Sequence, residues 1–171
     1  MRVLGIDPGL TRCGFGIIDS TGTGKASLVA VGVLRSDAQA PLELRLLEID
    51  TAMNSLFAQY LPDAVAVERV FAQANVRTVM GTAQVSGLAL VNASRRDLPV
   101  RSYTPSEVKA AITGSGRADK SQVGTMVTKI LGLSEMPKPA DAADALAIAL
   151  CHLWRGAAQD RLAAAVKAAR R

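Results

Sequence analysis

Residues 3–34, VLGIDPGLTRCGFGIIDSTGTGKASLVAVGVL, decide the fold of this chain. They contain three apolar runs, Val3–Asp7, Phe15–Asp19 and Leu28–Leu34, separated by short segments rich in glycine and threonine. Apolar runs joined by such short turns predict three strands in an antiparallel meander. The first strand ends in an acid, Asp7, directly before a Pro-Gly turn.

The rest of the chain alternates helical patterns with short apolar runs. In chain order, we predict a helix over 41–60, a strand over 65–68, a helix over 75–96, a strand over 98–103, and helices beginning at Pro105, Ser121 and Ala140. Strands that alternate with helices add in parallel to a sheet. The expected fold is therefore one α/β domain over residues 1–154, a mixed five-stranded sheet flanked by helices. Residues 155–171 form a basic C-terminal helix extension or tail.

Composition narrows the class of protein. The chain has 171 residues, 49% of them hydrophobic, which excludes a wholly disordered chain. No uninterrupted apolar run reaches about 18 residues, so we expect no membrane span and no membrane partner. The two cysteines, Cys13 and Cys151, form no disulfide framework, which favours a cytoplasmic location. The net charge of +5 indicates an anionic partner without naming it.

Four acids stand where burial is expected. Asp7 and Glu68 end apolar strands, and Asp141 and Asp144 lie three residues apart on one face of an Ala-rich helix. Like charges at that spacing repel, and a carboxylate on an apolar face is costly without a partner. A divalent cation is such a partner, because Mg²⁺ and Mn²⁺ prefer oxygen ligands. The alternative for each acid is a helix cap or a solvated strand end.

Three blocks in these regions form a familiar pattern: Gly5-Ile6-Asp7-Pro8-Gly9, Val67-Glu68-Arg69-Val70-Phe71 and Ala140-Asp141-Ala142-Ala143-Asp144-Ala145. They resemble the bacterial RuvC-type Holliday-junction resolvases, in order and over nearly the whole chain from Arg2 to about His152. The resemblance implies a ribonuclease H-like fold and a catalytic tetrad at Asp7, Glu68, Asp141 and Asp144. Some members of the family carry His at the third position, whereas this chain has Asp141.

The same resemblance implies the activity. It is that of a metal-dependent endonuclease that resolves four-way DNA junctions by paired symmetric nicks in homologous recombination and repair. Two Mg²⁺ ions in each active site, with Mn²⁺ as a substitute, would support phosphodiester hydrolysis. The resemblance also implies a homodimer, whose two equivalent sites suit a twofold-symmetric junction. RuvA and RuvB, the branch-migration proteins, are the partners it implies.

Basic residues are concentrated away from the acids. Residues 69–134 contain nine bases and three acids, whereas residues 1–68 contain five bases and eight acids. A cation that neutralises a phosphate strengthens DNA binding, and an aromatic side chain can stack on a base. By family resemblance and by position, the expected DNA contacts are Phe71, Arg69, Arg77, Lys109, Arg117 and Lys120. The alternatives are solvated surface bases and, for Phe71, a core position.

Other functions share parts of the pattern. The segment Asp7-x-Gly9-x-Thr11-x-x-Gly14 resembles the first phosphate loop of actin- and sugar-kinase-like ATPases, but those proteins need two such domains. A smaller nuclease of the same superfamily, or a module that binds junctions without cutting, also remains open. Residues 22–26 are similar to the end of a P-loop, but Asp19 stands where its first Gly is required and Ala26 where its Ser or Thr is required, so this motif is set aside. The presence of all four acids favours a nuclease.

Overall fold

The computed structural model describes residues 1–22, 24–70 and 76–169; for residues 76–78 and 157–169 it describes the backbone alone. Five strands form one mixed sheet in the order β3-β2-β1-β4-β5. The first three strands, β1 (Arg2–Asp7), β2 (Arg12–Gly22) and β3 (Lys25–Arg35), pair antiparallel. Two more, β4 (Ala64–Glu68) and β5 (Val100–Tyr103), extend the sheet in parallel. The predicted meander and the two parallel additions are confirmed.

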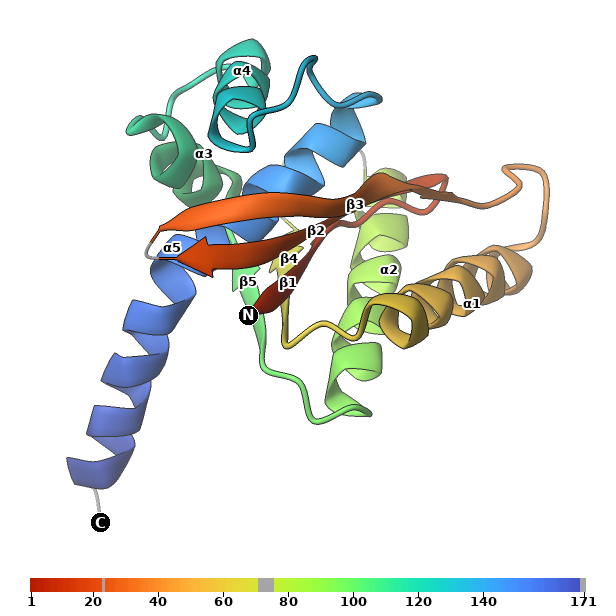
Figure 1. Cartoon of the computed structure of the whole chain (residues 1–171). Helices are drawn as coiled ribbons and strands as arrows, with labels where there is room; N and C mark the ends of the chain where they lie inside the picture. The colour runs from red at the N-terminus through yellow and green to blue at the C-terminus, as the bar shows by residue number, and fades with distance from the viewer. Residues whose placement is uncertain (23, 71–75, 170–171) are drawn as a thin grey trace.

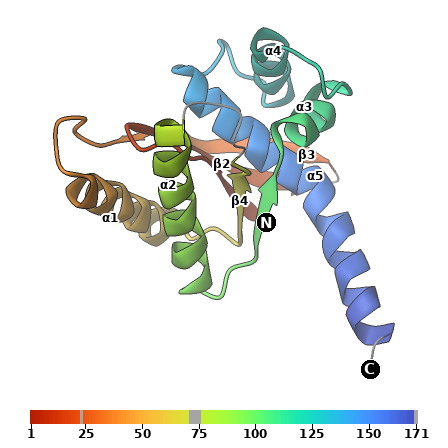
Figure 2. The same cartoon turned by 180° about the vertical axis from the view of Figure 1, so that it is seen from behind.

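Helices cover both faces of the sheet (Figures 1 and 2). One face carries α1 (Leu42–Tyr60) and α2 (Val76–Ser94). The other carries α3 (Pro105–Thr113), α4 (Lys120–Ile130) and α5 (Ala140–Ala169). Side chains of a strand alternate between faces, so Leu4 and Ile6 pack with α1 and α2, whereas Val3 packs with α5. By the same alternation, Asp7 lies on the α5 face.

Local signals explain several helix boundaries. Thr104 and Glu107 form a capping box at the start of α3, the helix predicted to begin at Pro105: the Glu107 N–H donates to Thr104 Oγ1 at 3.2 Å, and the Thr104 N–H donates to Glu107 Oε2 at 2.8 Å. Asp119 caps α4 in the same way with Gln122, so this helix begins at Lys120. These bonds satisfy N–H groups that a helix start leaves unpaired.

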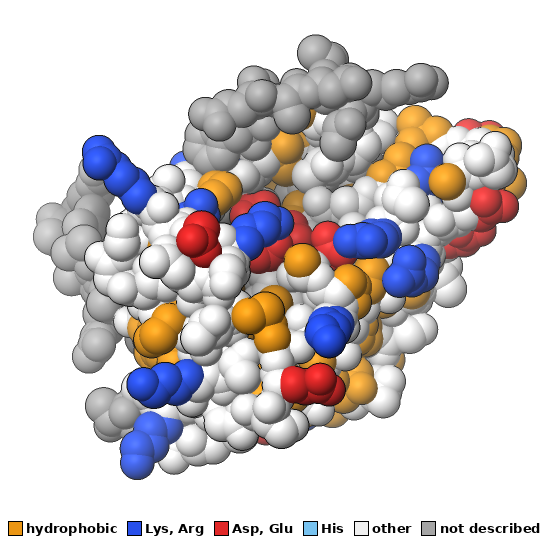
Figure 3. Space-filling view, turned by 90° about the horizontal axis from the view of Figure 1, so that it is seen from above, with side chains coloured by type: hydrophobic (Ala, Val, Ile, Leu, Met, Phe, Trp, Pro, Cys, Tyr) orange, Lys and Arg blue, Asp and Glu red, His pale blue; other side chains and the backbone are white. Residues whose placement is uncertain are grey.

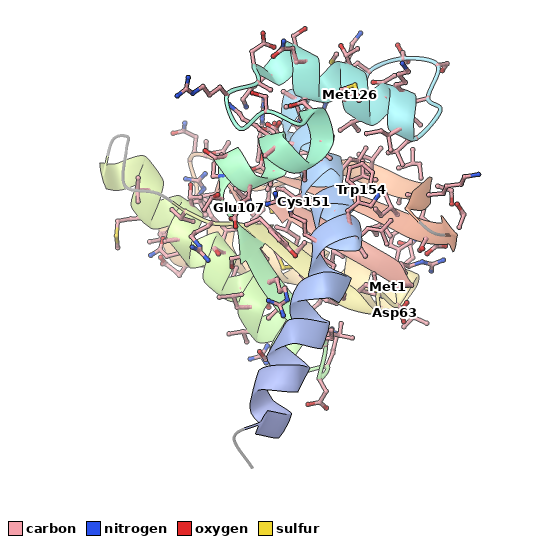
Figure 4. The ribbon with its side chains drawn as sticks, turned by 90° about the vertical axis from the view of Figure 1, so that its left-hand side faces the viewer. Met1, Asp63, Glu107, Met126, Cys151 and Trp154 are labelled. Carbon is pink, nitrogen blue, oxygen red and sulfur yellow. The ribbon has the colours of Figure 1, made fainter. Side chains whose placement is uncertain are left out.

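Helix α5 is the longest element and passes over β1 and β2. Its backbone continues beyond Trp154 to Ala169. The Trp154 indole Nε1–H donates to the carbonyl of Gly24, 3.0 Å away at the β2–β3 turn (Figure 4). This bond joins the helix to the far end of the hairpin. Within the described residues, no helix combines the length and apolar character that a membrane crossing requires.

Candidate active site

Two strand ends bring the first two acids together. β1 and β4 are neighbours that run in the same direction, with Ile6 paired to Val67. The next residue of each strand is an acid, Asp7 and Glu68. Because parallel strands end at the same edge of a sheet, both carboxylates lie at that edge, on the face covered by α5.

Glycines in the sheet bring α5 close to this edge. A Cβ atom added to Gly14 of β2 would lie 2.1 Å from the carbonyl oxygen of Asp141, and one added to Gly5 of β1 would lie 2.1 Å from that of Ala145. Both distances are far below van der Waals contact, so a larger residue would force the helix away. The first turns of α5, which carry Asp141 and Asp144, therefore lie directly on the ends of the strands.

Burial and like charges shift the protonation of the acids. The pKa of Asp7 is raised from 3.8 to about 8, first by burial and then by the neighbouring Glu68, Asp144 and Asp141. The pKa of Glu68 is also raised, first by burial and then by Asp144. Lys120 acts in the opposite direction on both groups. The ionised forms of Asp7 and Glu68 are therefore disfavoured in the chain alone, and a bound cation would favour them.

Two basic side chains contact the acids of α5. Lys120, at the start of α4, places Nζ 2.9 Å from Asp144 Oδ2. Arg12, at the start of β2, pairs through Nη2 with Asp141 Oδ2. In Figure 3, the molecule seen from above, acidic side chains gather near the middle of the face with Lys and Arg side chains beside them. Basic side chains thus pair with two of the four carboxylates, those of Asp141 and Asp144.

A cavity of about 280 Å³ opens at this edge. Three of the acids, Asp7, Glu68 and Asp144, line it together with Lys109 and Lys120. Asp141 is not among the described residues that line this cavity, and it contacts Arg12 instead. Among the residues that the structure describes, no three His, Cys, Asp or Glu side chains form a group that could hold a metal ion.

The donor chemistry nevertheless fits a divalent cation. Carboxylate oxygens are the ligands that Mg²⁺ and Mn²⁺ prefer. The pKa values of Asp7 and Glu68 are raised by burial first and by neighbouring carboxylates second. The basic groups on Asp141 and Asp144 show that these two carboxylates attract positive charge. Such an arrangement can bind cations beside a phosphate and support its hydrolysis.

The other predicted contacts lie at different distances from the acids. Lys109 and Lys120 line their cavity. Arg69 follows Glu68 directly and is exposed. Arg117 is exposed and lines a separate cavity of about 450 Å³ between α3 and α4. Phe71 lies outside the described residues, as does the side chain of Arg77.

Arg12 is the residue of this site that sequence reasoning missed. It lies 129 positions from Asp141 in the chain, and nothing in the local pattern of the β1–β2 turn marks it as a partner of α5. The one available signal was a base close in sequence to Asp7. The pairing follows from the close approach of α5 to Gly14, two residues further along β2.

Known proteins are similar to this chain over most of its length. The family model for crossover junction endodeoxyribonuclease RuvC matches residues 3–152. RuvC of Salinispora arenicola is 60% identical over 171 residues, which are 100% of this chain and 98% of that protein. RuvC of Thermobifida fusca is 63% identical over 165 residues, 96% of this chain and 91% of that protein.

Solved structures agree with the sequence comparisons. T. thermophilus RuvC in complex with a Holliday junction substrate has a TM-score of 0.86 and 38% identity, covering 91% of this chain and 94% of that one. The yeast mitochondrial Holliday junction resolvase Ydc2 shares the fold at 16% identity and a TM-score of 0.66, covering 90% and 78%. The ribonuclease H-like fold is therefore confirmed. By its sequence and its structure, this chain belongs to the RuvC family of crossover junction endodeoxyribonucleases.

Proposed function

We propose that Asp7, Glu68, Asp141 and Asp144 are the metal ligands and catalytic acids with which this chain cuts four-way DNA junctions. As a RuvC family member, the chain is an endonuclease that resolves Holliday junctions in recombination and repair and depends on a divalent metal. This decides for the nuclease against the ATPase and against the module that binds without cutting. The observation that carries the assignment is the cavity that joins Asp7, Glu68 and Asp144 to two lysines.

Two Mg²⁺ ions in each active site are the cofactor that we propose, with Mn²⁺ as a substitute. When bound, they supply Lewis-acid activation of the attacking water and of the leaving 3′ oxygen. The chain's own groups do the rest: Asp7 and Glu68 hold the cations at the strand ends, and Asp141 and Asp144 complete the ligand set from α5. The raised pKa of Asp7, to about 8, supports this role, because burial first and the neighbouring carboxylates second disfavour its ionised form, and a bound cation would favour that form.

The substrate's phosphates require positive groups near the acids. Lys109 and Lys120 line the cavity and are the residues that we assign to the phosphate at the cut. Arg69, Arg77 and Arg117 would contact the DNA backbone further away, each adding about one unit to the salt dependence of binding. Phe71 would stack on a base at the junction, so Phe71→Ala should bind junctions and cut them poorly.

We also propose an assembly and a setting. A homodimer would present two equivalent sites to a roughly twofold-symmetric junction, which explains paired nicks. RuvA and RuvB would be its branch-migration partners, and the cytoplasm, where bacterial DNA lies, its location. Analytical ultracentrifugation tests the dimer, and a monomer at micromolar concentration would contradict it.

The test of the site uses a synthetic four-way junction with Mg²⁺. Asp141→Asn should abolish symmetric nicking while junction binding, measured in Ca²⁺, stays within about threefold of the unmodified chain. A linear duplex of the same sequence is the control substrate and should stay uncut. Strong residual nicking by Asp141→Asn would contradict the ligand assignment.

A further inference from the structure

Arg12 contacts an acid that the proposed site needs for a metal ion. Its guanidinium Nη2 donates to Asp141 Oδ2, although the two residues lie on different elements, β2 and α5. The Asp141 side chain is 24% exposed and that of Arg12 is 46% exposed. Nearly half of Arg12 therefore faces solvent, so its side chain can leave Asp141 without breaking buried packing.

Arg12 lines a cleft of about 820 Å³ that is larger than the cavity of the acids and separate from it. The cleft lies between the β1–β2 turn, the segment leading into α1, and α2, and Thr11, Arg12 and Arg45 are among the residues that line it. Among the described residues that line the cleft, two are arginines and none is an acid. The cleft is therefore a basic surface that adjoins the acids at Arg12.

The second arginine is held in place by hydroxyl groups. Arg45 Nη2 donates to Thr11 Oγ1 at 2.7 Å, and Arg45 Nε donates to Ser36 Oγ at 3.1 Å. Neither bond neutralises the guanidinium, because both acceptors are uncharged. Arg45 thus keeps its charge fixed beside the turn that carries Arg12, and the cleft attracts anions.

We propose that Arg12 exchanges partners during the reaction, from Asp141 in the metal-free chain to a DNA backbone phosphate in the cleft when a divalent cation binds Asp141. The proposal rests on the proposed metal site. It makes Arg12 a positioning residue that couples occupation of the acids to binding of the junction strand. The cleft between the β1–β2 turn, α1 and α2 would then hold the phosphate backbone next to the cut.

Charge explains why the exchange is favourable. A divalent cation on Asp141 places positive charge where the guanidinium lies, and like charges at such short range repel. The released guanidinium needs another anion, which the described lining of the cleft does not offer and the DNA backbone does. The planar guanidinium also matches phosphate geometry, with two parallel hydrogen bonds.

A fixed clamp is the competing role for Arg12, and it predicts the opposite sign. If Arg12 only orients Asp141 for the metal, its removal should weaken metal binding. If Arg12 competes with the metal, removal should strengthen it. Titration of the metal alone, with Mn²⁺ followed by electron paramagnetic resonance in the absence of DNA, distinguishes the two. We expect Arg12→Gln to bind Mn²⁺ about 3- to 10-fold more tightly than the unmodified chain.

The second measurement is junction binding against salt in Ca²⁺, where binding is observed without cutting. Arg12→Gln should lower the slope of log K against log salt by about one unit, because one phosphate contact is lost. In EDTA, where Arg12 stays on Asp141, the slopes should coincide. Arg12→Lys keeps the charge and should retain most of the slope. Lys25→Gln, at the opposite end of the same hairpin, is the matched control and should behave as the unmodified chain.

The outcomes separate this inference from the proposed function. Unchanged or weaker Mn²⁺ binding by Arg12→Gln, or an unchanged salt slope in Ca²⁺, overturns the exchange. If Asp141→Asn binds Mn²⁺ as tightly as the unmodified chain, the metal site itself fails. If Asp141→Asn loses Mn²⁺ and cutting while Arg12→Gln changes neither measurement, the metal site stands and the role of Arg12 alone is wrong.

Discussion

Strand β1 begins at Arg2 and ends at Asp7, and the charges around these two ends are arranged differently. At the beginning, Arg2 donates through Nε and Nη2 to the two carboxylate oxygens of Asp19 at 2.9 and 2.8 Å. The Arg2 backbone N–H donates to Asp63, whose carboxylate also lies 4.0 Å from the Met1 amine (Figure 4). Each acid there has a basic neighbour, and the pKa of Asp19 is lowered, chiefly by its hydrogen bond to Arg2.

At the other end of β1, the Asp7 carboxyl lies among the carboxylates of Glu68, Asp141 and Asp144. The pKa of Asp7 is raised to about 8 by burial and by three further carboxylates. The first arrangement stabilises the folded chain, whereas the second opposes folding in the chain alone. Strained electrostatics of this kind mark a functional site, because the repulsion is useful only when a ligand relieves it. This contrast supports our proposal that the catalytic acids lie at one end of β1, whereas ion pairs at the other end stabilise the fold.

The largest expected effect comes from removing one acid at each end. Asp7→Asn should lower the rate of junction cutting about 1000-fold or more. Asp7 is a proposed metal ligand, and the metal ions would supply several kcal/mol of transition-state stabilisation. Asp19→Asn should cut within about twofold of the unmodified chain. Single-turnover cleavage of a four-way junction in Mg²⁺ measures both. Equal losses for the two variants would break the comparison.

The next effect concerns the approach of α5. Gly14→Ala places a Cβ 2.1 Å from the Asp141 carbonyl oxygen, so the start of the helix must shift. A displacement of about 1 Å can cost about 100-fold in rate, and we expect that loss together with about 1–3 kcal/mol of stability. Cleavage and urea unfolding of the same variant measure the two effects.

The control for this glycine is Gly24, at the opposite end of the β2–β3 hairpin. Gly24 has φ +73°, and among the described residues other than its chain neighbours no atom lies within 4 Å of an added Cβ. Gly24→Ala should therefore lose about 1–2 kcal/mol through backbone strain and keep its cutting rate. A Gly14→Ala chain that cuts as fast as Gly24→Ala would show that the close packing of α5 does not position the acids.

These contrasts also show what the sequence could reveal. The sheet and the placement of Asp7 and Glu68 were predictable, because turn lengths determine strand direction and parallel neighbours end at one edge. The pairing of Arg12 with Asp141 was not, since it depends on how closely α5 packs on β2. Leu42 lies seven residues before Ile49, a spacing that places both on one face of α1, yet Ile49 is buried and Leu42 is exposed beside the large cleft. Helical periodicity gives the direction of a side chain, but not whether a neighbour covers it.

The two ends should also respond to pH with opposite signs. Without metal, folded Asp7 keeps a proton up to about pH 8, while the unfolded chain releases it near its ordinary pKa of 3.8. Stability should therefore fall as pH rises from 5 to 8, by at most a few kcal/mol. For Asp19, whose folded pKa is lowered, the contribution is present above the ordinary pKa and is lost as pH falls through the folded value.

Urea unfolding in EDTA at fixed protein concentration, between pH 5 and 8, measures this effect. Asp7→Asn should flatten the decline, because the amide does not titrate. Asp19→Asn should keep the slope of the unmodified chain, since Asp19 stays ionised throughout that window. If the free energy of unfolding fell with pH equally in Asp7→Asn and in the unmodified chain, the raised pKa of Asp7 would not be the cause of the decline.

The smallest expected effect comes from the paired end itself. Arg2→Gln removes the bidentate pair with Asp19 and the bond from Nη1 to the Tyr60 carbonyl at 2.7 Å. Because solvent screens this pair, we expect Tm to fall by no more than about 4 °C, less at high salt, with the cutting rate unchanged. Thermal unfolding at 0.05 and 0.5 M NaCl checks this. A slower cutting rate in Arg2→Gln would mean that the two ends of β1 are coupled through the strand. One end could then no longer be described as stabilising and the other as catalytic.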